Sequence, residues 1–204
     1  MADPTAMRPR RRWSSSVLAA LALITLVGLA GCSTDSTPVS AFAARATDVT
    51  AAYVEESQAI GYTYQRSIEL EVGQIVDEGA ESAVERATEL VRSETVAYLA
   101  VLADAVTRYS EAFEALPVPA AVQQERDDYV AVVELARESI PSMREAVADA
   151  ASIPMIRLAL ASSTYADSAE AWTAACRSLE QAVRDEGHGI DLKCERPDVS
   201  EVTP

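Results

Sequence analysis

The chain has 204 residues and a formal net charge of −15, with 32 acidic residues against 17 basic ones. Because excess negative charge repels nucleic-acid phosphates and anionic lipid head groups, this balance argues against nucleic-acid binding and electrostatic membrane adhesion. Aromatic residues make up only 5% of the chain, and there are seven glycines. This composition favours helices, since an interior glycine costs a helix about 1 kcal/mol.

The N-terminal residues have the organisation of an export signal. A basic cluster of Arg8, Arg10, Arg11 and Arg12 precedes an apolar run from residue 17 to residue 30. The run is shorter than the roughly 20 residues that a helix needs to cross a bilayer. A short apolar run behind basic residues is typical of a cleaved signal segment.

At the end of this run, Leu29-Ala30-Gly31-Cys32 resembles the lipobox of bacterial lipoproteins. The resemblance covers only the leader. It implies that residues 1–31 are a signal peptide, that cleavage leaves Cys32 as the mature N-terminus, and that Cys32 carries a diacylglycerol thioether. Two acyl chains give stable membrane anchoring. The resemblance therefore predicts a lipid-anchored protein on the extracytoplasmic face of the cell membrane.

The mature chain after Cys32 begins with a polar stretch and continues with four long segments of helical character. Residues 32–38 read as a polar tether. Proline and glycine then delimit segments over residues 39–76, 80–116, 120–151 and 155–186. Short turns between long helices favour antiparallel neighbours, so the sequence predicts an all-α domain over residues 39–188, an up-down-up-down four-helix bundle. Pro141 is expected to kink the third helix without ending it.

Apolar residues in these segments recur at spacings of three and four, which places them on one face of each helix. The second segment places on its face Val84, Val91, Tyr98, Leu102, Ala105, Tyr109, Ala112 and Leu116. The last segment places on its face Met155, Leu158, Ser162, Tyr165, Ala169, Trp172, Cys176, Leu179 and Val183. The first segment has a looser face.

Cys176 and Cys194 are the only cysteines after Cys32. In an exported protein such a pair predicts a disulfide. The residues from Gly187 to Cys194 are long enough to turn back along the last helix, so the bond would pin the tail at residues 189–204.

No motif for catalysis, metal binding or cofactor binding is present, and no cofactor is expected. The single histidine, His188, lies between glycines, and the acidic runs lack the spacing of a calcium loop. Aromatic residues on the predicted faces could line a ligand cleft between helices, but core packing is the favoured explanation for them. They are Tyr98, Tyr109, Tyr129, Tyr165 and Trp172.

The sequence therefore favours a non-enzymatic binding or interaction module of the cell envelope, with an envelope protein or a small ligand as its partner. Two alternatives stay open. One is a small-ligand carrier or sensor with an aromatic-lined cleft, and the weaker one is an envelope hydrolase. A carrier requires a cavity behind the tyrosines, whereas an interaction module requires exposed apolar surface.

Overall fold

The computed structural model describes residues 37–77, 82–161 and 164–194, without the side chains of residues 164–167. All of them belong to the second of the chain's two compact units, Ser36–Pro204. Their secondary structure is helical, with no strand in these ranges, which confirms the all-α prediction. None of the described helices is both long and apolar enough to span a bilayer. The signal segment, Cys32 and most of the tether lie outside the described residues.

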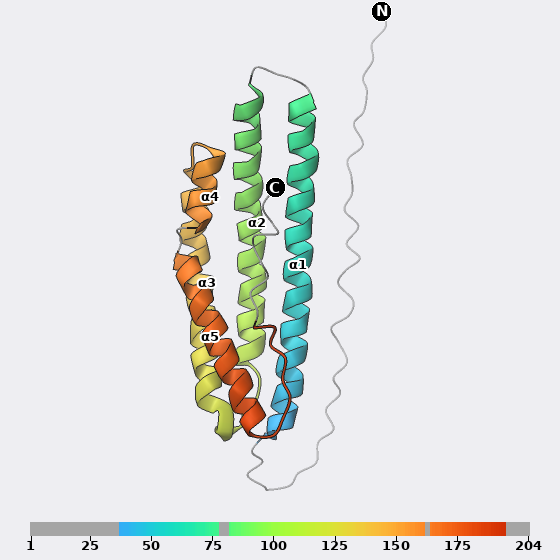
Figure 1. The fold of residues 1–204 in the computed structure, drawn as a ribbon, viewed down its shortest axis with the longest axis vertical. Helices are drawn as coiled ribbons and strands as arrows, with labels where there is room; N and C mark the ends of the chain where they lie inside the picture. The colour runs from blue at the N-terminus through green and yellow to red at the C-terminus, as the bar shows by residue number, and fades with distance from the viewer. Residues whose placement is uncertain (1–36, 78–81, 162–163, 195–204) are drawn as a thin grey trace, which may run out of the picture. The chain divides into compact units, whose positions relative to one another are not determined.

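The first two helices form a long antiparallel pair (Figure 1). Helix α1 spans Val39–Asp77 and helix α2 spans Ala83–Glu114. The 39 residues of α1 correspond to about 58 Å at 1.5 Å per residue. Gly61 and Gly73 lie inside α1 without ending it. The register of the pair is fixed by two hydroxyl contacts, from Thr50 to Tyr109 and from Tyr64 to Thr95.

A short 3-10 turn, η1 (Ala120–Val122), leads into helix α3 (Gln123–Ala148), which packs against α2. Pro141 lies inside α3 and the helix continues past it, as predicted. Its ring removes one backbone donor and normally bends a helix locally. The residues of α3 that face the core include Tyr129, Val133, Ile140 and Val147.

The last predicted helix differs from the prediction, because two helices, α4 (Ile153–Ala161) and α5 (Thr164–Asp185), occupy its range. The sequence predicts that Pro154 separates two helices, but Pro154 lies in the first turn of α4. Proline is tolerated there, because the backbone amides of the first turn have no partner within the helix. Ser152 immediately precedes α4 and caps it. Its carbonyl accepts a hydrogen bond from the amide of Ile156, and its hydroxyl accepts one from the amide of Met155.

The predicted apolar face of this segment is wrong at its start and right further on. Met155 and Leu158 are 49% and 63% exposed, whereas Ile156 is buried. Cys176, Leu179 and Val183 are buried as expected. The predicted face assumed one continuous helix from residue 155 to 186, and α4 does not share the helical phase of α5.

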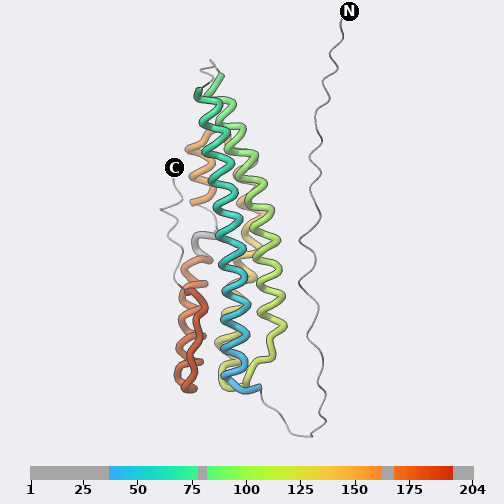
Figure 2. Tube along the Cα trace, turned by 90° about the vertical axis from the view of Figure 1, so that its right-hand side faces the viewer, coloured from blue at the N-terminus to red at the C-terminus, as the bar shows by residue number. Residues whose placement is uncertain are grey.

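Helix α5 packs against α3, and the C-terminal segment turns back beside it (Figure 2). Gly187 has a φ of +81°, which a side chain would disfavour, and its amide bonds to the carbonyl of Arg184. The amide of His188 bonds to the carbonyl of Val183. These two bonds form a Schellman motif, which ends the helix and reverses the chain. His188 therefore serves as a turn residue through its backbone.

Candidate functional site

The structure brings three of the five predicted cleft residues together in the core. Tyr109 comes from α2, Tyr129 from α3 and Trp172 from α5. The rings of Tyr109 and Trp172 stack with centroids 6.0 Å apart, and Tyr129 meets Trp172 edge-on at the same distance. Each of these three helices contributes one of these rings, because the apolar helix faces that carry the residues are turned toward one another.

Two further rings complete this aromatic cluster. Tyr53 of α1 stacks on Tyr109 with centroids 4.6 Å apart and reaches Trp172 at 6.3 Å. Phe113 of α2 packs edge-on against Tyr129 at 5.0 Å. Offset and edge-to-face arrangements of this kind are favourable beyond the burial of apolar area. The aromatic cluster, defined as Tyr53, Tyr109, Phe113, Tyr129 and Trp172, therefore joins α1, α2, α3 and α5.

The phenol groups of Tyr109 and Tyr129 in the aromatic cluster have hydrogen-bonding partners within the protein. The hydroxyl oxygens of Tyr109 and Tyr129 lie 2.6 Å apart, and the Tyr109 hydroxyl is 3.2 Å from Oγ1 of Thr50. Both tyrosines are buried. Burial raises the pKa of Tyr109 above its usual 10.0, and it raises the pKa of Tyr129 further, with the neighbouring Tyr109 as a second cause. Both groups are therefore neutral hydrogen-bonding partners at neutral pH.

The other two predicted cleft residues do not join this cluster. Tyr98 lies half-buried against Tyr64, with ring centroids 4.7 Å apart, and the Tyr64 hydroxyl is 2.8 Å from Oγ1 of Thr95. The backbone of Tyr165 lies in α5, but its side chain is outside what the structure describes. Of the four predicted cleft residues whose side chains are described, three therefore lie together in the aromatic cluster and Tyr98 lies apart from them, against Tyr64.

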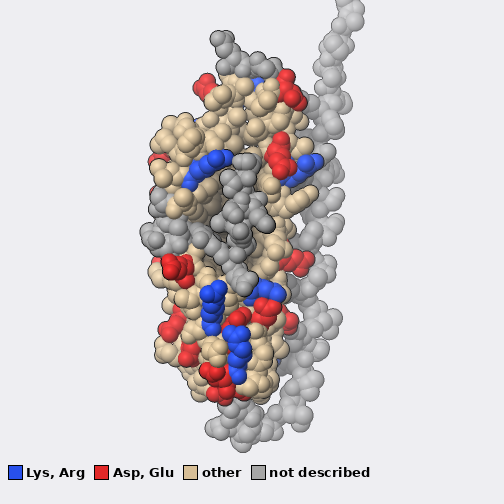
Figure 3. Space-filling model, viewed as in Figure 1, with Lys and Arg blue, Asp and Glu red and all other residues tan. Residues whose placement is uncertain are grey.

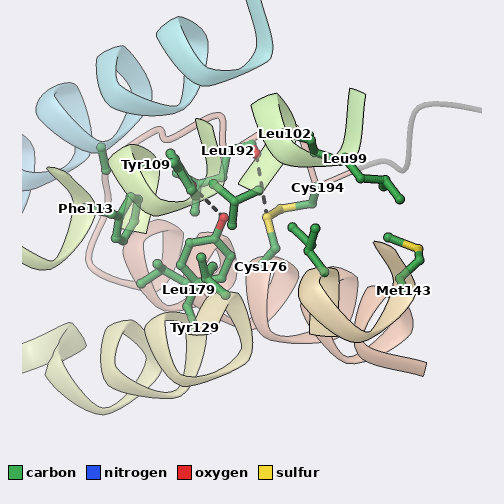
Figure 4. Close-up of a cluster of buried hydrophobic side chains, with 14 of the residues drawn as sticks. Leu99, Leu102, Tyr109, Phe113, Tyr129, Met143, Cys176, Leu179, Leu192 and Cys194 are labelled. Atoms are coloured by element: carbon green, nitrogen blue, oxygen red, sulfur yellow. Dashed lines mark hydrogen bonds between the residues drawn. A yellow bond between two sulfur atoms is a disulfide. The ribbon is translucent and has the colours of Figure 1, made fainter. Parts of the chain in front are cut away.

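Cys176 of α5 and Cys194 form the predicted disulfide, with an S–S distance of 2.05 Å (Figure 4). After α5, residues 188–194 form a strap without regular secondary structure between α5 and α1, visible in red in Figure 1. Leu192 of this strap is buried in the same core as Tyr109 and Leu179. The strap therefore contributes a core side chain where α1 and α5 would otherwise face each other.

Backbone hydrogen bonds hold the strap to both helices. The amide of Leu192 donates to Oε1 of Glu180 at 2.9 Å, and the amide of Asp191 donates to Oγ1 of Thr47 at 3.3 Å. At the surface, Nζ of Lys193 lies 2.5 Å from the Asp191 carboxylate. This contact lowers the pKa of Asp191 and raises the pKa of Lys193. Leu192 faces inward, whereas Asp191 and Lys193 are exposed. Lys193 has a φ of +51°, so the backbone bends there before Cys194.

Hollows occur on the outer side of α5 and are open to solvent. One of about 360 Å³ is lined by Arg177, Glu180, Asp191, Lys193 and Cys194. A second of about 410 Å³ follows α5 from Ala169 to Arg177. Both lie away from the aromatic cluster, and the charges of the first hollow include the Asp191–Lys193 pair. Neither hollow is enclosed, as the sites that bury small ligands usually are.

Acidic side chains do not converge on a metal site in the part of the chain that the structure describes. The surface around the strap carries both signs of charge (Figure 3). One acid with a role in the core region is Glu134 of α3, which accepts a hydrogen bond from Ser110 of α2 and pairs with Arg137.

Sequence reasoning missed Thr50, whose hydroxyl reaches the aromatic cluster. A signal was present, since Phe42, Ala46 and Thr50 follow one another at spacings of four, and all three are buried. Because Thr50 is polar, a search for apolar residues alone does not assign it to the buried face of α1. Glu180 pairs with Arg184 at a helical spacing of four, but it also contacts the strap. The second contact depends on a chain reversal that sequence spacing does not reveal.

The chain matches no family model, and no curated protein or solved structure is significantly similar to it. The functional interpretation therefore rests on residues and geometry alone.

Proposed function

We propose that the chain is a lipoprotein of the bacterial cell envelope, held at the extracytoplasmic face of the membrane by lipid on Cys32. Its helical domain would act as a binding or interaction module without enzymatic activity. In this proposal residues 39–188 form an up-down-up-down four-helix bundle, with α4 and α5 sharing the fourth position and the strap sealing the side between α5 and α1.

The lipobox resemblance of Leu29-Ala30-Gly31-Cys32 supports the anchor. The Cys176–Cys194 bond supports the location, because structural disulfides persist mainly in oxidising compartments outside the cytoplasm. An anchor also suits this domain physically. Residues 32–204 carry 13 basic and 31 acidic residues, a net charge of −18, so electrostatics would not hold them at an anionic membrane.

The packing of the aromatic cluster carries the preference for an interaction module over a carrier. The hydroxyls of Tyr109 and Tyr129 bond to each other, and Trp172, Phe113 and Tyr53 occupy the space around them. A ligand entering here would have to separate buried rings and leave two phenols to find new partners, each at a cost of about 1–3 kcal/mol. The outer surface is therefore the favoured place for recognition.

Feeding bacteria that express the full chain with an alkyne-bearing fatty acid tests the anchor. The wild type and a Ser33→Ala control should carry the label, and Cys32→Ala should not. Intact-mass analysis of the wild type should show Cys32 as the lipid-bearing N-terminus. A wild-type protein that keeps residues 1–31 and carries no acyl chain would refute the lipoprotein proposal.

A further inference from the structure

The end of the α1–α2 pair that contains the C-terminus of α1 and the N-terminus of α2 carries exposed apolar and acidic side chains. We define the hairpin end as residues 69–77 of α1 and 82–89 of α2. Nη1 of Arg92 bonds to the carbonyl of Ala150, so the connection between α3 and α4 lies at the level of residue 92. The hairpin end extends past that level (Figure 1). It is therefore a two-helix projection beyond the packed helices.

Apolar side chains remain exposed on this projection. Val76 is 64% exposed and Val84 is 80% exposed, although Ile75 beside them is buried. The register set by Thr50–Tyr109 and Tyr64–Thr95 places Val76 of α1 opposite residues 83 and 84 of α2. The two valines thus lie at the same level of the pair. Helices in proteins owe most of their stability to packing, so a third helix that packs against this two-helix projection would stabilise it.

The charge of the hairpin end specifies the kind of element. Residues 69–77 and 82–89 include five acidic residues and one basic residue, Arg86, a net charge of −4. This is more than one fifth of the net charge of residues 32–204 within about one tenth of their length. A second copy of the chain would meet like charge at this surface, which disfavours self-association here. A basic partner would gain affinity and a faster encounter.

We propose that the hairpin end is the docking surface for a basic, amphipathic segment of another protein. Apolar side chains of that segment would cover Val76 and Val84, while its lysines or arginines would face carboxylates such as Glu71 and Glu85. Such a helix-against-helix contact is a common mode of peptide recognition. The inference deepens the proposed interaction module by naming its surface and partner chemistry. It does not depend on how Cys32 is modified.

The test uses the full chain in a nonionic detergent and a fluorescent Leu/Lys peptide whose leucines fall on one helical face. Two control peptides have either Ser in place of Leu or Glu in place of Lys. Fluorescence anisotropy should show binding of the Leu/Lys peptide alone, weakening about tenfold from low to high salt because charge attraction is screened. Hydrogen exchange should show new protection at the hairpin end.

Matched variants locate the site. Val76→Ser with Val84→Ser should weaken peptide binding about tenfold, since each valine loses its burial in the complex. The control variant Val101→Ser with Leu135→Ser changes apolar side chains that are 48% and 56% exposed but lie outside the hairpin end, and it should bind as the wild type does. Likewise, Glu85→Lys should weaken binding and Glu138→Lys should not.

Equal binding of the Leu/Lys and Ser/Lys peptides, or protection spread over all helices, would overturn the proposal in favour of general charge attraction. Dimers that form through the hairpin end in sedimentation experiments would overturn it in favour of a second copy. If the acyl label is found on Cys32 and no peptide binds, this inference fails while the lipoprotein proposal stands.

Discussion

The hydroxyl oxygens of Tyr109 and Tyr129 lie 2.6 Å apart in the core, where α2, α3 and α5 meet. Each hydroxyl gives the other a hydrogen-bonding partner that water cannot supply there. The contact therefore couples two helices through a polar bond inside an apolar environment, and its energetic value can be measured directly.

Removing either tyrosine hydroxyl should lower the free energy of unfolding, because the hydroxyl that remains loses a buried hydrogen-bonding partner. Tyr109→Phe leaves the Tyr129 hydroxyl without its Tyr109 partner, and we expect a loss of about 1–2 kcal/mol in the free energy of unfolding. Tyr129→Phe should cost less, because Tyr109 keeps Thr50. The double variant should cost less than the sum of the two, as coupled partners do. Urea unfolding measures all three, and strict additivity would show that the bond contributes nothing.

Alkaline pH should destabilise the fold through the same residues. Burial raises the pKa of both tyrosines above the value near 10 that they have when unfolded. The unfolded chain then loses phenol protons at a pH where the folded chain keeps them. Stability is thus fully present below about pH 10 and falls above it by up to about 1.4 kcal/mol per pH unit for each tyrosine.

Urea midpoints at a series of pH values from 8 upward check this sign. Tyr129→Phe should make the decline above pH 10 shallower. Tyr62→Phe, at a tyrosine that is exposed, should leave the decline unchanged. An equal decline in both variants would show that Tyr129 titrates normally.

Loss of the disulfide should lower stability by about 3 kcal/mol, because Cys176 and Cys194 close a loop over a sequence separation of 18. The variant that replaces both cysteines with alanine tests this without reductant. Hydrogen exchange should show faster exchange of the Leu192 amide in that variant. If that amide remains as protected as in the wild type, the hydrogen bond to Glu180 holds the strap unaided.

Leu192→Ala should cost about 2–5 kcal/mol, the usual effect of truncating a buried leucine. Leu158→Ala is the matched control, because Leu158 is exposed and its loss should change stability by less than about 0.5 kcal/mol. Thermal or urea unfolding compares them. Equal effects would mean that the strap does not contribute to the core.

Pro141→Ala should stabilise the protein by about 1–3 kcal/mol, since it restores a backbone donor within α3 and removes the clash of the proline ring. Pro141 is exposed, so little packing is lost. A variant less stable than the wild type would show instead that the bend is required for the packing of Ile140 and Met143.

Periodicity predicted the helical class and most of the core. Spacings of three and four placed Tyr109, Tyr129 and Cys176 correctly, because apolar faces of long helices must be buried somewhere. The same reasoning failed at Met155 and Leu158, because α4 does not share the helical phase of α5. It failed at Val84 because that residue lies in the first turn of α2, where the apolar pattern continues although the side chain stays exposed.

The aromatic cluster could be predicted only in part. The sequence identifies which tyrosines face inward, but not that Tyr109 and Tyr129 meet while Tyr98 lies one level away with Tyr64. That difference depends on the register between helices, which long-range packing sets. The role of Glu180 was hidden for the same reason, since its partner is a backbone amide brought back by the turn at Gly187.

The position of Cys194 in the chain also fixes an order of assembly. Because Cys194 follows every described helix, its bond to Cys176 can form only after α1 to α5 have all been synthesised. The side between α1 and α5 is therefore the last to be closed covalently. A chain cut short just before Cys194 would contain every described helix and still lack the disulfide, so a formed disulfide marks a chain whose production has been completed through residue 194.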